Sequence, residues 1–190
     1  TTDAAFSVAG ATTLAGNTVV STGSGAATFS GTVNGGFALT VNSTGAATFA
    51  AAVGGTTALA SLTTDAGGTT SLRNVTTVGA ITLGDAATLN GTYTTTDAAF
   101  SVAGATTLAG NTVVSTGSGP ATFSGTVDGG FALTVNSTGA GTFAAAVGGT
   151  TALASLTTNA GGTTSLRDVM TIGAITLGDA VTLTGTYTTT

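Results

Sequence analysis

Large apolar residues recur along the whole chain at the end of one short pattern. The pattern runs Gly or Asp, two small residues, Thr or Ser, and then a large apolar residue, as in the segment 25–29 (GAATF). These terminal apolar residues, here called anchors, are spaced 15, 20, 23, 17 and 19 residues apart from Leu14 to Leu108. The spacing predicts five units of about 19 residues in each half of the chain, and about ten coils in all.

Short alternations of apolar and polar residues lie between the anchors. Examples are the segments 6–8 (FSV), 37–41 (FALTV) and 81–83 (ITL), which are bounded by Gly, Asp or Asn. Period-two alternation between such residues is typical of β-strands. Helices are disfavoured because Gly and Thr are abundant while Glu, Lys and Gln are absent. The sequence therefore predicts an all-β fold.

Strands this short need neighbours, because a unit of about 19 residues cannot bury its own apolar face. Stacked units predict a β-solenoid in which the anchors form one internal ladder and the preceding hydroxyls an outward one. The segment from Leu14 to Ser24 is expected to be a short coil. The predicted internal ladder is Leu14, Phe29, Phe49, Leu72, Leu89, Leu108, Phe123, Phe143, Leu166 and Leu183, and the outward ladder begins Thr13, Thr28, Thr48, Ser71 and Thr88.

The chain consists of two nearly identical copies. Residues 3–96 and 97–190 align without a gap and differ at only nine of 94 positions. We therefore predict two major repeats, 1–96 and 97–190, of five coils each, which continue as one rod. Ten coils at about 4.8 Å would span roughly 48 Å. All ten aromatic residues are expected at core or strand positions, and both ends of the rod are expected to present unpaired strand edges.

The composition excludes most catalytic chemistry. Thr, Ala and Gly account for 114 of the 190 residues, while Lys, Glu, Gln, His, Cys and Trp are absent. Imidazole and thiol catalysis and the usual zinc sites are therefore excluded. A net charge of −5 with two Arg argues against nucleic acid, and no apolar run is long enough for a spanning helix. We predict no enzymatic activity, no cofactor, and no catalytic, cofactor-binding or metal-binding residue.

The polar residues still raise alternatives. Asp3, Asp65 and Asp85 suggest calcium, but they are isolated in sequence, and turn formation is the favoured interpretation. The hydroxyl ladder suggests ice binding, although coils of unequal length would make the face uneven. Four Asn-x-Ser/Thr sites are attributed to chance in a Thr-rich chain, and Arg73 and Arg167 are expected to pair with a nearby Asp such as Asp168. The four sites begin at Asn42, Asn74, Asn90 and Asn136.

Three strings resemble a known kind of protein. The segments 29–36 (FSGTVNGG), 52–59 (AVGGTTAL) and 62–70 (LTTDAGGTT) are similar to the β-strand-repeat regions of giant bacterial surface proteins. Those are filamentous-haemagglutinin-like and autotransporter-like adhesins and related fibre proteins. The resemblance covers both copies and implies a right-handed parallel β-helix that projects from the cell.

These observations predict a structural protein that forms a stiff extracellular bacterial filament or adhesin stalk at the cell surface. Its expected partner is itself, through head-to-tail association or continuation of the same repeat chain, with lateral bundling favoured by the low charge. The alternative is a β-solenoid module that binds a surface, a glycan or ice.

Overall fold

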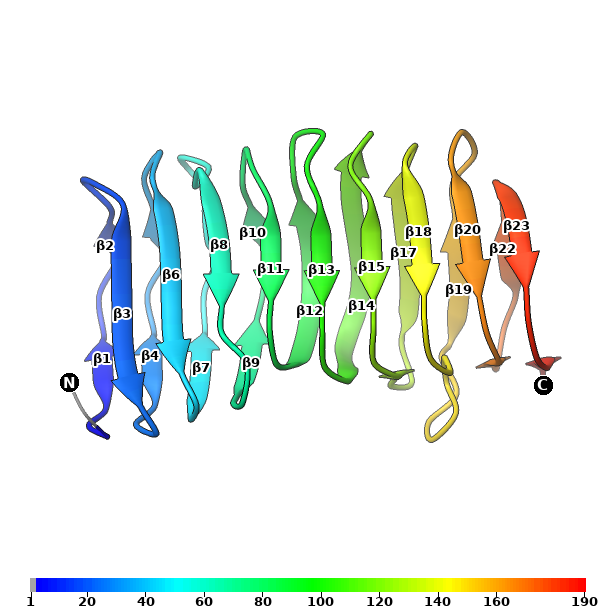
Figure 1. The fold of residues 1–190 in the computed structure, drawn as a ribbon, viewed down its shortest axis with the longest axis horizontal. Helices are drawn as coiled ribbons and strands as arrows, with labels where there is room; N and C mark the ends of the chain where they lie inside the picture. Colours follow the sequence, from blue (N-terminus) through cyan, green and yellow to red (C-terminus); the bar gives the residue numbers. More distant parts are fainter. Residues whose placement is uncertain (1–2) are drawn as a thin grey trace.

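The computed structural model describes residues 3–190 as a single rod of short parallel strands, without any helix in that range. The N- and C-termini lie at opposite ends of the rod (Figure 1). Every strand pair is parallel. The strands form three ladders that run along the rod axis, here called ladders 1, 2 and 3 in the order in which the chain first visits them.

Ladder 1 begins with β1 and ends with β24, and Val147 bridges its strands β16 and β21. Its members are β1 (Phe6–Val8), β4 (Ala27–Phe29), β7 (Ala46–Phe49), β9 (Thr69–Leu72), the first parts of β12 (Ala86–Thr94) and β14 (Thr106–Gly117), β16 (Val127–Asp128), β21 (Val169–Thr171) and β24 (Tyr187–Thr189).

Ladder 2 follows ladder 1 in each turn, and Val53 bridges its strands β5 and β10. Its members are β2 (Thr12–Thr13), β5 (Val33–Asn34), β10 (Val75–Thr76), the later parts of β12 and β14, β17 (Ala132–Ser137), β19 (Ser155–Thr158) and β22 (Ile175–Leu177).

Ladder 3 is a continuous sheet of nine strands. Its members are β3 (Thr18–Gly23), β6 (Ala38–Ser43), β8 (Ser61–Thr64), β11 (Ile81–Leu83), β13 (Phe100–Val102), β15 (Ala121–Phe123), β18 (Ala140–Phe143), β20 (Thr163–Leu166) and β23 (Ala180–Leu183). Nine strands correspond to about nine turns of the described chain, slightly fewer than the ten predicted.

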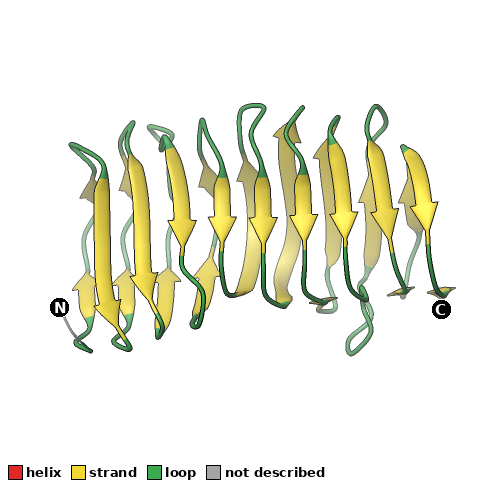
Figure 2. Ribbon diagram, in the orientation of Figure 1, coloured by secondary structure: helices red, strands yellow, loops and turns green. Residues whose placement is uncertain are grey.

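The predicted β-solenoid is confirmed, and its hand can be followed in Figure 1. The nearer strands of ladder 3 point downward and the more distant strands of ladders 1 and 2 point upward, while the chain advances from left to right (Figures 1 and 2). This path is a right-handed coil, the hand that parallel strand crossovers adopt almost without exception.

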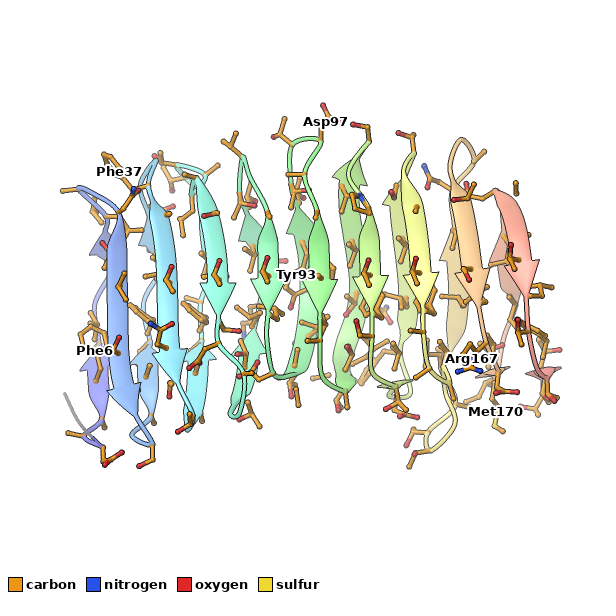
Figure 3. The ribbon with its side chains drawn as sticks, viewed as in Figure 1. Phe6, Phe37, Tyr93, Asp97, Arg167 and Met170 are labelled. Carbon is orange, nitrogen blue, oxygen red and sulfur yellow. The ribbon has the colours of Figure 1, made fainter. Side chains whose placement is uncertain are left out.

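One apolar core runs the length of the rod, because alternate residues of each short strand point inward. In β4, β11 and β15 the two outer residues are buried and the central Thr is only partly covered. The aromatic rings stack along the axis: Phe29 on Phe49 at 5.0 Å and Phe123 on Phe143 at 5.1 Å between ring centroids. Tyr93 lies inside the rod near its middle (Figure 3).

Two aromatic residues lie outside this core, contrary to the prediction for all ten. Phe37 and its counterpart Phe131 are each 40% exposed at a corner between strands. Phe37 is at the upper edge of the rod in Figure 3. The position directly before a strand belongs to the corner, so its side chain does not alternate into the core.

The anchors do not form one internal ladder. Phe29, Phe49, Leu72, Leu89 and Leu108 follow one another on ladder 1. Leu14 instead follows β2 on ladder 2, where its backbone N–H bonds to the carbonyl of Asn34. The anchors from Phe123 to Leu183 lie on ladder 3. The 15 residues from Leu14 to Phe29 are therefore less than one turn, and the predicted short coil does not exist.

Each copy of 94 residues falls one ladder short of five turns. Phe6 lies on ladder 1, but its counterpart Phe100 lies on ladder 3. Likewise Thr12 of ladder 2 corresponds to Thr106 of ladder 1, and Thr18 of ladder 3 to Thr112 of ladder 2. The prediction of five coils per copy is wrong by this third of a turn. In Figure 1 the loop before β8 accordingly lies at the top and the corresponding loop before β19 at the bottom.

Differences in turn length are absorbed at the corners, as the unequal spacings predicted. Along ladder 1, successive turns run from Ala27 to Ala47, then to Thr70, and then to Ala87, so they contain 20, 23 and 17 residues. The paired strands stay in register across these unequal turns. The three ladders are therefore regular although the coils are not.

Candidate functional site

The most regular polar feature is a column of hydroxyl side chains along the outside of ladder 3. The central residue of each strand pairs with the central residue of the next, so the column continues across both copies. It consists of Thr40, Thr63, Thr82, Ser101, Thr122, Thr142, Ser165 and Thr182. The column is straight, contrary to the uneven face expected from unequal coils, because the length differences lie in the corners.

A second hydroxyl column follows ladder 1, where the sequence predicted one. Its members are Ser7, Thr28, Thr48, Ser71, Thr88 and Thr107. Thr13, which was predicted to begin this column, lies on ladder 2 opposite Asn34. Beyond Thr107 the column meets Asp128, because the second copy is shifted by one ladder.

Most Asp and Asn side chains close corners between adjacent turns. Asp3 Oδ1 accepts the backbone N–H of Ser24 at 3.0 Å, and Asp97 Oδ1 accepts that of Ser118 at 2.8 Å. Both aspartates have positive φ, a conformation that Asp tolerates better than most residues. The hydrogen bonds favour the charged carboxylate, so the pKa of each lies below its usual value.

Carboxylate and amide oxygens are interchangeable at other corners. Asp65 Oδ1 accepts the backbone N–H of Ser43 at 2.8 Å, and its counterpart Asn159 accepts that of Ser137 at the same distance. This is the turn role favoured by the sequence. Within residues 3–190, no three acidic side chains gather as a cation site would require.

Asp85 is the exception, and sequence reasoning missed it. Its side chain is only 4% exposed and points into the corner between β11 and β12. Oδ1 accepts hydrogen bonds from Thr70 Oγ1 at 2.8 Å and from Thr64 Oγ1 at 3.5 Å, whereas Oδ2 has no partner. Burial raises the pKa of Asp85, an effect that the Thr70 hydrogen bond opposes and the charge of Asp65 reinforces.

One signal in the sequence could have identified this residue. Five pairs of corresponding positions contain an Asp in at least one copy; three of them exchange Asp for Asn between the copies, but Asp3/Asp97 and Asp85/Asp179 do not. The first pair has positive φ, and the second occupies the inward-facing corner. The pairs that keep Asp in both copies are therefore those with a positive φ or with an inward-facing side chain.

Replacing Asp85 with Asn should stabilise the protein at neutral pH. Because the pKa of Asp85 is raised on folding, its proton-linked stabilisation is present below pH 3.8 and is lost as pH rises through the raised value. Removing the buried charge is expected to increase the free energy of unfolding at pH 7 by about 1 kcal/mol. Urea unfolding at pH 3.5, 5 and 7 would measure this change and the flatter pH dependence.

The matched control is Asp179→Asn. Asp179 is only partly buried, and its two oxygens accept hydrogen bonds from Gly162 N at 3.1 Å and from Thr164 Oγ1 at 2.7 Å. Its replacement should change the unfolding free energy by less than about 0.5 kcal/mol. A less stable Asp85→Asn protein at pH 7 would contradict the interpretation of Asp85 as an uncompensated buried charge.

The arginines do not form the predicted ion pair. Within residues 3–190, neither arginine lies in salt-bridge contact with a carboxylate; Arg167 Nη1 donates to the carbonyl of Ala144 at 3.5 Å. Asp168 instead accepts the backbone N–H of Thr186 at 2.8 Å. Corner closure therefore takes precedence over charge pairing at Asp168.

Three of the four asparagines in the glycosylation motifs also bridge turns. Asn42 and Asn136 donate to Ser21 and Ser115 at 3.4 Å, and Asn74 Oδ1 accepts the backbone N–H of Thr92 at 2.8 Å. These contacts give the asparagines a structural role.

A small pocket lies beside Met170 near the C-terminal end of the rod, where Figure 3 labels this residue. Its only ionisable lining residue is Asp168, which is already bonded to Thr186. General acid–base chemistry needs a positioned pair of titratable groups, which this pocket does not bring together.

Fold and surface together define the class of the molecule as a parallel β-solenoid with hydroxyl-lined faces. Comparison with protein-family models, curated proteins and solved structures finds no match for the chain. No helix among residues 3–190 is long and apolar enough to cross a bilayer.

Proposed function

We propose that this chain is a non-enzymatic structural segment of a stiff extracellular bacterial filament or adhesin stalk. The observation that carries the proposal is the continuity of the three ladders across the junction of the two copies. Ile81 and Leu83 of copy 1 pair with Phe100 and Val102 of copy 2 in the same way as strands pair within a copy. A rod built in this way can be extended by adding copies.

Its mechanical role rests on the direction of its interactions. Backbone hydrogen bonds between turns lie along the rod axis, and the stacked rings of the core follow the same axis. Bending the rod must therefore strain the ladders and the core together. The low charge of the chain, with two Arg and seven Asp, leaves little repulsion between parallel rods and favours bundling.

Electron microscopy of chains with two, four and six copies tests the proposal. Each copy comprises slightly less than five turns, so rod length should increase by about 22 Å per copy at constant width. Oriented fibres should diffract at about 4.8 Å along the axis. Particles whose length does not scale with copy number would contradict the role as a rod. Antibodies against the repeat should label intact cells of the source organism; labelling only after lysis would contradict the extracellular assignment.

The second candidate is a binding module for ice or another ordered surface, and the hydroxyl column of ladder 3 favours it. Eight consecutive hydroxyl residues are spaced by the turn-to-turn distance of about 4.8 Å. Measurement of ice-crystal growth in the presence of the protein distinguishes the two functions. The rod proposal predicts no effect, whereas inhibition that is lost in Thr122→Tyr would favour ice binding.

A further inference from the structure

The C-terminal end of the rod exposes residues whose counterparts in copy 1 are fully buried. Leu183 is 53% exposed, whereas the corresponding Leu89 is 0% exposed. Ile175, Leu177 and Tyr187 are likewise partly exposed, while their counterparts are buried, namely Ile81, Leu83 and Tyr93. The end is therefore an open section through the core.

What covers this surface in copy 1 is the first turn of copy 2. Phe100 and Val102 pair with Ile81 and Leu83, and Leu108 pairs with Leu89. Val114 in turn pairs with Tyr93. These contacts form an apolar interface between copy 1 and copy 2 within the same chain.

The N-terminal end has the same residues as this covering turn. Residues 3–25 are identical to 97–119. Phe6 and Val8 are only partly buried, whereas Phe100 and Val102 are 0% exposed. The receiving surfaces, 79–96 and 173–190, differ at two positions, where Val181 replaces Ala87 and Thr184 replaces Asn90. The two ends of the rod therefore carry the two halves of the junction between the copies.

We propose that the C-terminal end of one molecule binds the N-terminal end of a second copy of this chain in the register of the internal junction. Ile175 and Leu177 then pair with Phe6 and Val8 of the second molecule, and Leu183 pairs with its Leu14. This inference rests on the proposed function and specifies the partner, the orientation and the register of assembly.

Two end variants and their mixture test the proposal. Leu183→Lys should block the C-terminal end and Val8→Lys the N-terminal end, and each should weaken association at least about 30-fold. Each variant alone retains one intact end and should remain monomeric by sedimentation velocity. An equimolar mixture should form dimers and no longer species, because only one intact pair of ends is present.

Controls separate docking from folding and from general surface effects. Val78→Lys and Ile172→Lys place the same charge on residues that are 58% and 60% exposed, and both proteins should assemble like the parent chain. Circular dichroism should give all four variants the parent β-sheet spectrum.

The outcomes distinguish this inference from the proposed function. Linear oligomers of the parent chain at pH 7 that are lost in each end variant would support it. A parent chain that remains a monomeric rod at about 100 μM and pH 7 would overturn docking and leave the structural role intact. Oligomers that persist in both end variants would also overturn it, because they would require another interface. Particles that are not rods would contradict the proposed function itself.

Discussion

Replacing Phe123 with alanine is expected to lower the free energy of unfolding by about 3–5 kcal/mol, because it opens a cavity in the middle of the core. Phe123 is fully buried, and its ring lies between those of Phe100 at 5.6 Å and Phe143 at 5.1 Å. The strands of ladder 3 are fixed by their neighbours above and below, so the site cannot collapse without distorting both adjacent turns. Urea or thermal unfolding monitored by circular dichroism would measure the loss.

Phe131→Ala is the matched control for that substitution. It removes the same side chain eight residues further along the chain, at a corner where the ring is 40% exposed. The expected cost is below about 1.5 kcal/mol, because less apolar surface is lost from the folded state. Similar losses for the two variants would contradict the assignment of Phe123 to a rigid stacked core.

Gly119→Ala is expected to destabilise the rod by about 2–3 kcal/mol through overpacking at a corner. A Cβ at this position would lie within 3.0 Å of the backbone N, C and O atoms of Ala98 in the preceding turn. These atoms belong to the backbone, so the two turns would have to separate. The Gly119 carbonyl also accepts hydrogen bonds from Thr116 and Ser137, which such a movement would weaken.

Gly130→Ala provides the comparison for the glycine series. A Cβ at Gly130 would meet nothing within 4 Å, so alanine fits there without displacing a neighbour. Its effect should lie between zero and a stabilisation of about 1 kcal/mol, the range found when the unfolded chain loses glycine freedom. Equal destabilisation by both substitutions would show that close approach of the turns is not what requires Gly119.

The strands and their stacking could be predicted from the sequence because period-two alternation has a direct structural meaning. Segments such as 81–83 and 100–102 have the burial pattern that their alternation predicts. The number of residues per turn could not be predicted from the anchors alone. The pattern that ends at Leu14 or Phe29 marks the passage from a corner into a strand, and each turn has three such passages. An anchor therefore identifies a corner without saying on which ladder it lies.

For a related reason, the sequence predicted the role of some polar residues and missed that of others. Corner closure by Asp or Asn depends on the backbone N–H of the next turn, which every corner supplies, so Asp65 and Asn159 behaved as their residue types suggested. Whether a corner side chain points inward depends on a shift of a single residue. The Asp85 side chain points into the rod, whereas the Phe37 side chain points outward. The neighbouring sequence does not specify the direction of either side chain.

The one-ladder shift of each copy gives a longer rod a screw symmetry. A given side chain would return to the same side of the rod only after three copies, or about 14 turns and roughly 67 Å. Phe37 and Phe131, the exposed aromatics of copies 1 and 2, already lie at different corners of the rod. A receptor or a neighbouring rod approaching from one side would therefore meet any copy-specific feature at wide intervals. Flat lateral packing would have to rely on a feature that continues from copy to copy, such as the hydroxyl column of ladder 3.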